Sequence, residues 1–130
     1  MIVVDTSALL AVVLNELHSG ACKQVLRQED DILLSAGTLT ESLIVAGRRN
    51  VAPIMATLID EIGCQIIPVT RADAVGAAAA YAKWGKGIHP AGLNYGDSFA
   101  YALARQRQCP LLFVGDDFAR TDIEACFRPL

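Results

Sequence analysis

The sequence contains few aromatic residues and no closely spaced cysteines. Aromatic residues make up 6% of the chain, with a single tryptophan, Trp84, so we expect an aliphatic core of helices packed on a sheet. The four cysteines are far apart and form no C-x-x-C pair: Cys22, Cys64, Cys109 and Cys126. This spacing indicates neither a zinc site nor a thioredoxin-like redox motif, and we expect reduced, mostly buried thiols.

Long apolar segments are also missing from the sequence. No apolar run reaches the roughly 18 residues of a membrane span. The apolar opening, Met1 to Leu14, lacks the basic start of a signal peptide and is interrupted by the charge of Asp5. We therefore predict a cytoplasmic protein with no membrane segment.

Charge of one sign does not dominate the chain. The 11 basic and 14 acidic residues give a net charge of −3, so any binding of nucleic acid would depend on local Lys and Arg side chains and on metal ions. The only glycine-rich loop, near residues 85–92, lacks the spacing of a phosphate-binding P-loop and follows a predicted helix. With 130 residues, 53% of them hydrophobic, we expect one domain spanning residues 1–130.

Apolar periodicity and capping residues predict strands that alternate with helices. Strands are expected at 2–4, 32–35, 65–69 and 111–114, with a short fifth at 124–127. Helices are expected at 8–14, 19–28, 38–49, 52–62, 71–84 and 95–108. This alternation indicates an α/β fold with a mainly parallel central sheet of four to five strands, covered on both faces.

Four carboxylates lie where the chain turns into or out of a predicted helix: Asp5, Glu41, Asp97 and Asp116. In open α/β sheets, ligand sites form beyond the carboxyl ends of the strands. Acidic side chains gathered there repel one another unless a cation or a shared proton compensates them. Their placement therefore predicts one acidic, metal-holding cleft.

Each of these residues also has a structural explanation. Thr38 to Glu41 has the spacing of a capping box, and Asp97 lies three residues after Asn94, a second capping pattern. Asp5 ends the first strand, a poor position for an unpaired charge unless it faces a cleft. Asp116 and Asp117 both follow an apolar strand, and spacing does not decide which one projects into the site.

A cleft of this composition suits a hard divalent cation. Carboxylate oxygens favour Mg²⁺ or Mn²⁺, and the sequence has no paired His and Cys ligands of the kind that Zn²⁺ prefers. Such an ion lowers the pKa of a bound water and neutralises charge on a phosphodiester in the transition state. Metal-assisted phosphodiester hydrolysis is thus a coherent chemistry for the predicted site.

The motifs as a group resemble the PIN-domain ribonucleases, and among them the VapC toxins of toxin–antitoxin pairs. The resemblance covers nearly the whole chain and is carried by four segments: Val3 to Leu9, the early-helix Glu41, Leu93 to Ser98, and Leu112 to Phe118 with Thr121-Asp122. It implies a PIN-like three-layer α/β/α domain.

The same resemblance implies the roles of the site residues. Asp5, Glu41, Asp97 and Asp116 would form the catalytic, metal-binding quartet, and Asp117 is a second candidate for the fourth position. Hydrogen bonds from Thr6 or Ser7 would support the site. A homodimer, an RNA substrate, an Mg²⁺ or Mn²⁺ cofactor and a cognate antitoxin are implied as well.

Two other functions compete with this hypothesis. A phosphatase of the haloacid-dehalogenase kind also begins with an Asp after its first strand, but its second Asp would stand where this chain has Ser7. A non-catalytic α/β binding module, with acids that only cap helices, is the alternative from another class. Arg48, Arg49, Lys83, Lys86 and His89 are weaker candidates for RNA contacts, as are the aromatic side chains of Trp84 and Tyr95 for base stacking.

Overall fold

Strands and helices alternate along the chain in the computed structural model, which describes residues 1–127. The strands are β1 (Ile2–Val4), β2 (Ile32–Ser35), β3 (Gln65–Ile67) and β4 (Leu111–Leu112). The α-helices are α1 (Thr6–Val13), α2 (Ser19–Gln28), α3 (Ala36–Arg48), α4 (Ala52–Glu61), α5 (Arg71–Trp84) and α6 (Tyr95–Arg107), and a 3-10 turn, η1, covers Phe118–Arg120. The α/β prediction is confirmed.

The strands form one sheet in the order β3-β2-β1-β4, and every pairing is parallel. Val3 of β1 is in register with Leu33 on one side and with Leu111 on the other. Because all four strands run the same way, their carboxyl ends lie at the same edge of the sheet. The residues that follow β1, β2 and β4 therefore start their loops or helices from one edge.

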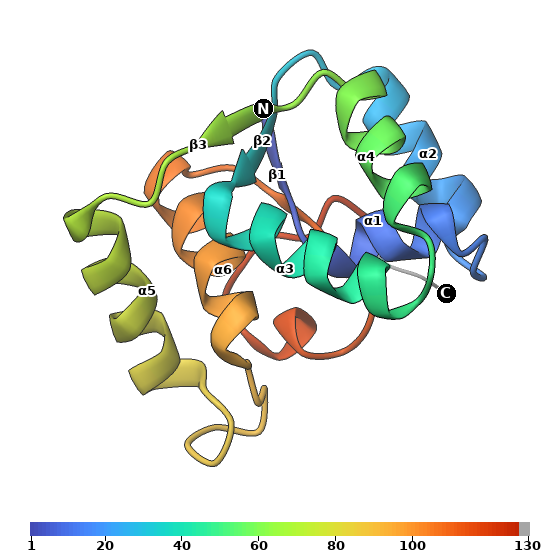
Figure 1. Ribbon diagram of the computed structural model, residues 1–130. Coiled ribbons are helices and arrows are strands. Elements are labelled where there is room, and N and C mark those ends of the chain that lie inside the picture. Colours follow the sequence, from blue (N-terminus) through green and yellow to red (C-terminus); the bar gives the residue numbers. More distant parts are fainter. Residues whose placement is uncertain (128–130) are drawn as a thin grey trace.

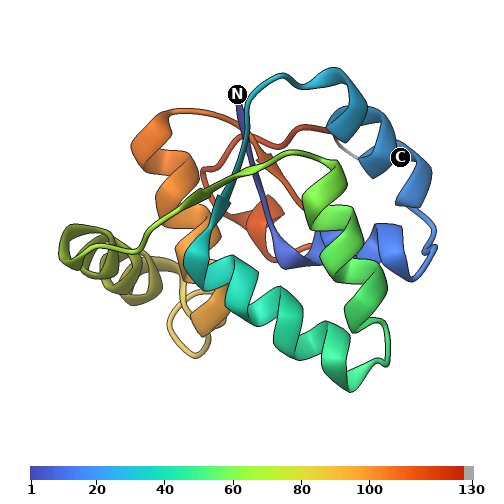
Figure 2. The ribbon, with the colours of Figure 1, turned by 45° about the horizontal axis from the view of Figure 1, so that its top comes forward.

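Alternating side chains of the strands enter two separate cores. Val3, Leu33 and Leu111 pack with α6 on one face, whereas Val4, Leu34 and Leu112 pack with α1, α2 and α4 on the other. Figures 1 and 2 show these helices on opposite sides of the sheet, with α5 outside α6. This arrangement is the predicted three-layer α/β/α sandwich, and the period of two along each strand produces it.

Helix α3 begins earlier than the sequence suggests and links the two sides of the molecule. Ser35, the last residue of β2, caps it by accepting a hydrogen bond from the backbone N–H of Gly37 at 3.2 Å. The helix contacts α1 and α4 on one side and α6 on the other. The capping box predicted at Thr38 to Glu41 is therefore wrong, because Glu41 lies in the second turn of the helix.

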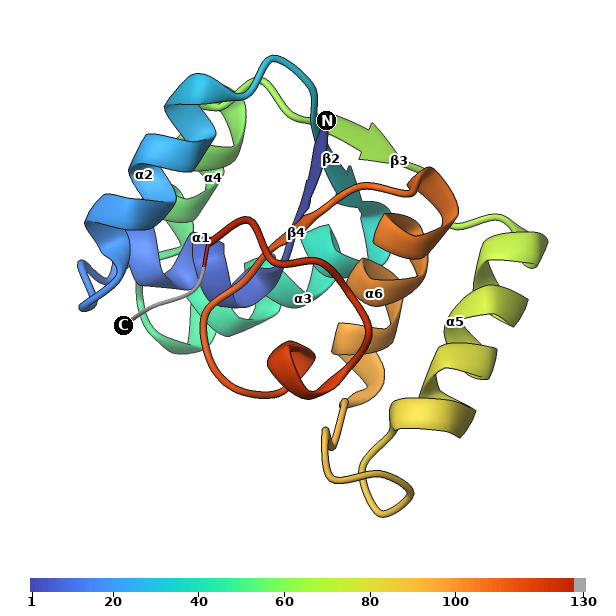
Figure 3. The same ribbon diagram turned by 180° about the vertical axis from the view of Figure 1, so that it is seen from behind.

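The segment after β4 returns to the sheet without forming a full strand. It turns through η1 and comes back beside β4, where Leu111 and Ala125 make one parallel bridge. Figure 3 shows this path from behind. The fifth strand predicted at 124–127 is thus reduced to a single bridge, and the described sheet has four strands.

All four cysteines lie among the described residues and are unpaired. Cys22 and Cys109 are buried, and burial raises the pKa of the Cys22 thiol to about 11 and that of the Cys126 thiol to about 12. No helix within residues 1–127 combines the length and the apolar character needed to cross a membrane.

Replacing a core side chain of β2 tests this packing. Leu34 is 1% exposed, so we expect Leu34→Ala to lower the free energy of unfolding by about 2–5 kcal/mol. The matched control is Leu17→Ala, because Leu17 is 92% exposed and should change stability by no more than about 0.5 kcal/mol. Urea unfolding followed by circular dichroism measures both, and equal losses would contradict the assignment of the core.

Candidate active site

Asp5 stands directly after β1, at the carboxyl edge of the sheet. Its side chain is 3% exposed and caps α1. Oδ2 accepts hydrogen bonds from the backbone N–H of Ser7 at 3.0 Å and from the Ser7 hydroxyl at 2.7 Å. The Ser7 hydroxyl oxygen also accepts a hydrogen bond from the Val114 N–H at 3.0 Å. One serine therefore joins the start of α1 to the segment that follows β4.

The other carboxylate oxygen of Asp5 has no such support. Oδ1 is buried and meets no hydrogen-bond partner among the described residues. A buried, unpartnered carboxylate oxygen costs free energy unless a proton or a cation compensates it. A capping role accounts for Oδ2 only.

Asp97 lies in the first turn of α6. It forms a complete capping box with Asn94, in which the Asp97 N–H donates to Asn94 Oδ1 at 2.8 Å and the Asn94 N–H donates to Asp97 Oδ2 at 3.0 Å. Asp97 is nevertheless buried, with only 8% of its surface exposed. The capping role predicted for Asp97 is confirmed, and the cap fixes a buried carboxylate at the start of the helix.

Glu41 reaches the site from α3. Its Oε1 accepts a hydrogen bond from the Thr6 hydroxyl at 2.7 Å, which ties α3 to the first residue of α1. Since Glu41 makes no cap contact, the position of its carboxylate has no explanation in the local stability of α3. Thr6, expected as a supporting residue, makes this contact, and Ser7 supports Asp5.

The carboxylates act on one another electrostatically. Burial raises the pKa of Asp5 to about 6, opposed by the hydrogen bonds from Ser7 and increased by the charge of Glu41. Burial also raises the pKa of Asp97 to about 7, with additional repulsion from Asp5, Glu41 and Asp117. These three acids and Asp117 thus share one electrostatic environment, although they come from four different parts of the chain.

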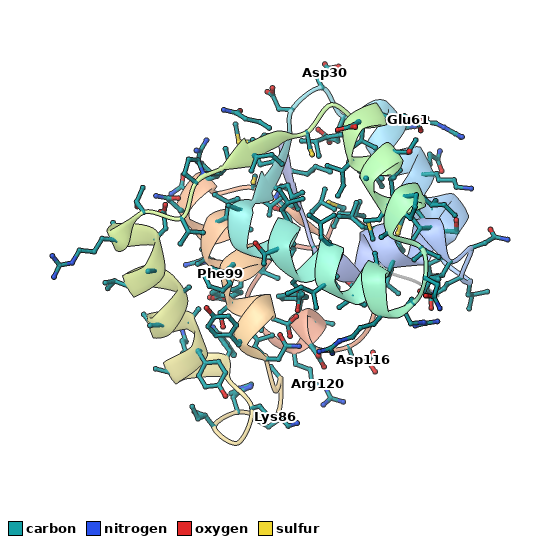
Figure 4. The ribbon with its side chains drawn as sticks, viewed as in Figure 1. Asp30, Glu61, Lys86, Phe99, Asp116 and Arg120 are labelled. Atoms are coloured by element: carbon teal, nitrogen blue, oxygen red, sulfur yellow. The ribbon has the colours of Figure 1, made fainter. Side chains whose placement is uncertain are left out.

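The adjacent acids Asp116 and Asp117 differ in their surroundings. Both are exposed. Asp117 raises the pKa of Asp97, whereas Asp116 lines a hollow with His18 and Phe127 on the side of α2. Figure 4 shows Asp116 at the outer edge of the molecule. Of the two candidates for the fourth acid, Asp117 is the one whose charge is among the causes that raise the pKa of Asp97.

The described carboxylates are oriented by separate hydrogen bonds rather than by a common centre. Within residues 1–127, no three His, Cys, Asp or Glu side chains are close enough together to hold a metal ion. Each carboxylate instead has one oxygen that accepts a hydrogen bond from one other residue: Asp5 from Ser7, Glu41 from Thr6 and Asp97 from Asn94. The donor chemistry still fits a hard cation, because Oδ1 of Asp5 is buried without a partner amid repelling carboxylates.

Two residues beside Glu41 were not predicted from the sequence. Ser42 is fully buried, and its hydroxyl oxygen lies 3.0 Å from the hydroxyl oxygen of Thr6. Gly96, just before Asp97, leaves the space that the Glu41 carboxylate occupies. A glycine in the first turn of a capped helix, where the backbone does not require one, was the available signal. Nothing in the sequence distinguishes Ser42.

The candidate RNA-contacting residues fall into two groups. Trp84 donates from Nε1 to the Tyr101 hydroxyl at 2.9 Å and packs edge-on against His89 at a 4.6 Å ring distance, so both are structural. Arg48 and Tyr95 line a hollow of about 390 Å³ together with Glu41. Tyr95 is 77% exposed there. This hollow places a basic side chain and an exposed aromatic ring next to the Glu41 carboxylate.

Asp122 and Asp73 both make structural contacts. Asp122 accepts a hydrogen bond from the Tyr101 hydroxyl and lies 4.0 Å from the Arg105 guanidinium. Asp73 forms an exposed capping box with Thr70. Neither residue takes part in the cleft.

Comparison with known proteins gives a consistent family. The model of the PIN domain family matches residues 2–124. Ribonuclease VapC42 of Mycobacterium tuberculosis is 40% identical over 129 residues, covering 95% of this chain and 98% of that protein. Ribonuclease VapC28 of the same organism is 40% identical over 126 residues, covering 94% and 95%.

Solved structures share the fold at lower sequence identity. Mycobacterium tuberculosis VapC20, a Sarcin-Ricin loop cleaving toxin, superposes with a TM-score of 0.80 at 18% identity and covers 99% of this chain and 100% of its own. A toxin–antitoxin complex from Klebsiella pneumoniae gives 0.70 at 18% identity, covering 94% and 93%. VapBC2 from Rickettsia felis, bound to a promoter DNA fragment, gives 0.68 at 14% identity, covering 96% of both chains.

The buried carboxylates predict an unusual dependence of stability on pH. Because the pKa values of Asp5 and Asp97 are raised from 3.8 to about 6 and about 7, the folded protein holds protons that the unfolded chain has released. In EDTA, the contribution of these two groups to the free energy of unfolding should therefore fall as pH rises from about 4 to about 7. Asp5→Asn should raise stability at neutral pH by up to about 2–3 kcal/mol.

Urea unfolding at several pH values, with and without Mn²⁺, measures this effect. Mn²⁺ should stabilise the wild type at neutral pH and should stabilise Asp5→Asn much less, since a ligand bound only by the native state raises its stability. Asp60→Asn, an exposed position in α4, is the control. A wild type whose stability is unaffected by Mn²⁺ would contradict the metal assignment.

Proposed function

Because this chain belongs to the PIN-domain family, as a VapC-type endoribonuclease, we propose that it is the toxin of a toxin–antitoxin pair and cuts RNA in the cleft between Asp5, Glu41 and Asp97. Family membership rests on the match over residues 2–124 and on relatives 40% identical over nearly the full length of both chains. The observation that carries the site is the buried, unpartnered Oδ1 of Asp5.

PIN-domain ribonucleases generally depend on a divalent metal ion. We propose Mg²⁺ or Mn²⁺ for this chain, because the cleft offers carboxylate oxygens and no sulfur or imidazole ligand. Asp5, Asp97 and Glu41 would hold the ion, together with a carboxylate from the pair Asp116 and Asp117. When bound, such an ion supplies an activated water and neutralises charge on the phosphodiester.

The chain's own residues prepare this chemistry by fixing the acids in place. Ser7 holds Oδ2 of Asp5, and the Asn94 backbone holds Oδ2 of Asp97. Thr6 holds Oε1 of Glu41. One oxygen of each carboxylate is thus bonded to the scaffold, and the second oxygen is the one we assign to the ion. Preorganisation of this kind limits the cost of orienting ligands during turnover.

The fourth acid is the position where the chain offers two candidates. The sequence resemblance places Asp116 there, whereas the charge of Asp117 reaches Asp97. We propose that Asp117 contributes to the site at least as much as Asp116. RNA would approach over the hollow lined by Arg48 and Tyr95, with the guanidinium on a phosphate and the exposed ring against a base.

Two partners complete the proposal. An antitoxin protein fits the toxin–antitoxin complexes among the structural neighbours, and it would neutralise the enzyme by filling the cleft. A homodimer is supported by exposed apolar side chains beside the hollow and on the outer helix, Ile44 on α3 and Val75 on α5, at 52% and 63% exposure. Phe99 on α6 lies between these two helices (Figure 4).

The alternative of a non-catalytic module explains less. Capping accounts for Asp97 and for one oxygen of Asp5. It does not account for Glu41, which caps no helix and instead faces Thr6 across two elements. Family membership also sets aside the phosphatase hypothesis.

RNA cleavage by the purified protein tests the proposed function. We expect Mg²⁺- or Mn²⁺-dependent cleavage that EDTA abolishes, and we expect Asp5→Asn and Asp97→Asn to reduce the rate by at least about a hundredfold, the scale on which a lost electrostatic group reduces catalysis. Both replacements preserve the size of the side chain. At position 97, asparagine also keeps a side-chain oxygen for the capping box. Asp60→Asn is the control for an acid outside the cleft.

The same assay separates the two candidates for the fourth acid. Asp117→Asn should reduce cleavage by at least as large a factor as Asp116→Asn, because the charge of Asp117 raises the pKa of Asp97. A larger loss for Asp116→Asn would assign the fourth position to Asp116. Metal-independent cleavage, or full activity in Asp5→Asn, would contradict the mechanism.

Expression in bacterial cells tests the biological role. Induction of the wild type should arrest growth, whereas induction of Asp97→Asn at the same level should not, since the toxic effect requires RNA cleavage. Co-expression of a cognate antitoxin, sought in a small reading frame next to this gene, should restore growth. The antitoxin protein should co-purify with the toxin. Equal growth arrest by wild type and Asp97→Asn would show that toxicity does not come from the cleft.

A further inference from the structure

We propose that Ser42 and Gly96 are positioning residues that together set the place of the Glu41 carboxylate, one acting at each of its oxygens. Ser42 acts through the Thr6 hydroxyl on Oε1, and Gly96 acts by leaving room for Oε2. The inference rests on the proposed function for its activity readout. Metal binding tests it without RNA.

The hydroxyl side of this arrangement follows from a count of protons. Thr6 and Ser42 have one hydroxyl proton each, and three acceptors surround them: Oε1 of Glu41 at 2.7 Å from Thr6, Oγ1 of Thr6 at 3.0 Å from Ser42, and the Thr38 carbonyl at 2.8 Å from Ser42. The carboxylate is the closest and most strongly charged acceptor for the Thr6 proton. With the Thr6 proton on Glu41, the single Ser42 proton is shared between the Thr38 carbonyl at 2.8 Å and Oγ1 of Thr6 at 3.0 Å, as a bifurcated hydrogen bond.

Burial makes this direction fixed. Ser42 is 0% exposed and Thr6 is 5% exposed, so water does not compete for their protons. Without the Ser42 hydroxyl, the Thr38 carbonyl would lose its side-chain donor and, at 3.5 Å from the Thr6 oxygen, would compete with Glu41 for the Thr6 proton. Ser42 thus keeps the Thr6 proton on Glu41, although it never touches the carboxylate itself.

The glycine side is a matter of space. A Cβ atom at Gly96 would lie 2.0 Å from Oε2 of Glu41 and 2.4 Å from its Cδ, well inside any real contact. Gly96 lies in α6 with an ordinary helical backbone, so its conformation does not call for glycine. Glycine is needed at this position because the first turn of α6 approaches the Glu41 carboxylate closely.

Gly37 provides a useful contrast. A Cβ there would lie 2.6 Å from the ring of Phe99, which is packed between α3 and α5. An alanine at 37 would therefore press on helix packing and reduce stability. An alanine at 96 meets the free end of a flexible side chain, so the fold can accept it while the Glu41 carboxylate moves away.

Gly96→Ala tests the steric half of the proposal. Alanine favours a helix over glycine, so the melting temperature should not fall. The dissociation constant for Mn²⁺ should rise about tenfold and kcat for RNA should fall by about the same factor, the usual scale for residues that orient metal ligands, with KM little changed. Gly47→Ala is the control, because a Cβ at that position of α3 meets nothing within 4 Å.

Ser42→Ala tests the hydroxyl half. We expect weaker Mn²⁺ binding and lower kcat by a similar factor. Thr40→Ala is the matched control: Thr40 lies in the same helix and makes the same kind of bond to a carbonyl four residues back, at 2.9 Å, but on the exposed side. Equal Mn²⁺ affinity in Ser42→Ala and Thr40→Ala would overturn the role of Ser42.

A double-variant cycle separates positioning from general structural damage. Glu41→Asp shortens the side chain and vacates the space beside Gly96, so adding Gly96→Ala should then cost little further in Mn²⁺ affinity. Equal losses in both backgrounds, or wild-type affinity in Gly96→Ala, would overturn the role of Gly96. A wild type that binds Mn²⁺ but cuts no RNA would refute the proposed function and leave this test intact.

Discussion

The burial of carboxylates at one edge of the sheet, together with their mutual repulsion, is the constraint on which the rest of this structure depends. Asp5 and Asp97 are almost fully buried, and each raises the energy of the other in its charged form. A protein that needed only stability would not place them together. The folded chain tolerates them because its sheet, its helix caps and its serine and threonine hydroxyls all hold them in position.

The parallel sheet supplies the convergence, and local hydrogen bonds supply the accuracy. β1 occupies an inner position with β2 and β4 as neighbours, so Asp5 and the segment after β4 begin at the same edge. Helix caps then fix two of the acids, since the capping box of α6 also orients Asp97. The same bonds therefore stabilise a helix and hold a carboxylate toward the cleft. Because one set of hydrogen bonds serves both purposes, the carboxylates are held rigidly without further helices or strands.

Much of the fold could be predicted from the sequence where local signals were unambiguous. The bounds of β1, α2 and β2 agree with the apolar patterns at 2–4, 19–28 and 32–35. The start of α3 was missed because Ser35 and Thr38 are both good capping residues, and it is Ser35 that caps the helix. The fifth strand was overestimated, since the apolar residues near Ala125 pack against the core without a continuous ladder.

The candidate site was predictable in its residue types but not in its contacts. Asp5 and Asp97 had clear positional signals at a strand end and a helix start. The contact between Thr6 and Glu41 joins residues 35 apart, and no periodicity reveals such a pair. The same limit applies to Gly96, whose significance depends on a carboxylate from another helix, and to Asp117, whose electrostatic reach depends on the path of the chain after β4.

The bond between Ser7 and Val114 also bears on when the enzyme becomes competent during its synthesis. It links residues 107 positions apart, and Asp97 and Asp117 lie in the last third of the chain. A ribosome that has made the first ninety residues has produced Asp5 and Glu41 but neither of those acids, nor β4. The proposed site is therefore complete only after nearly the whole polypeptide has been made and β4 has docked beside β1.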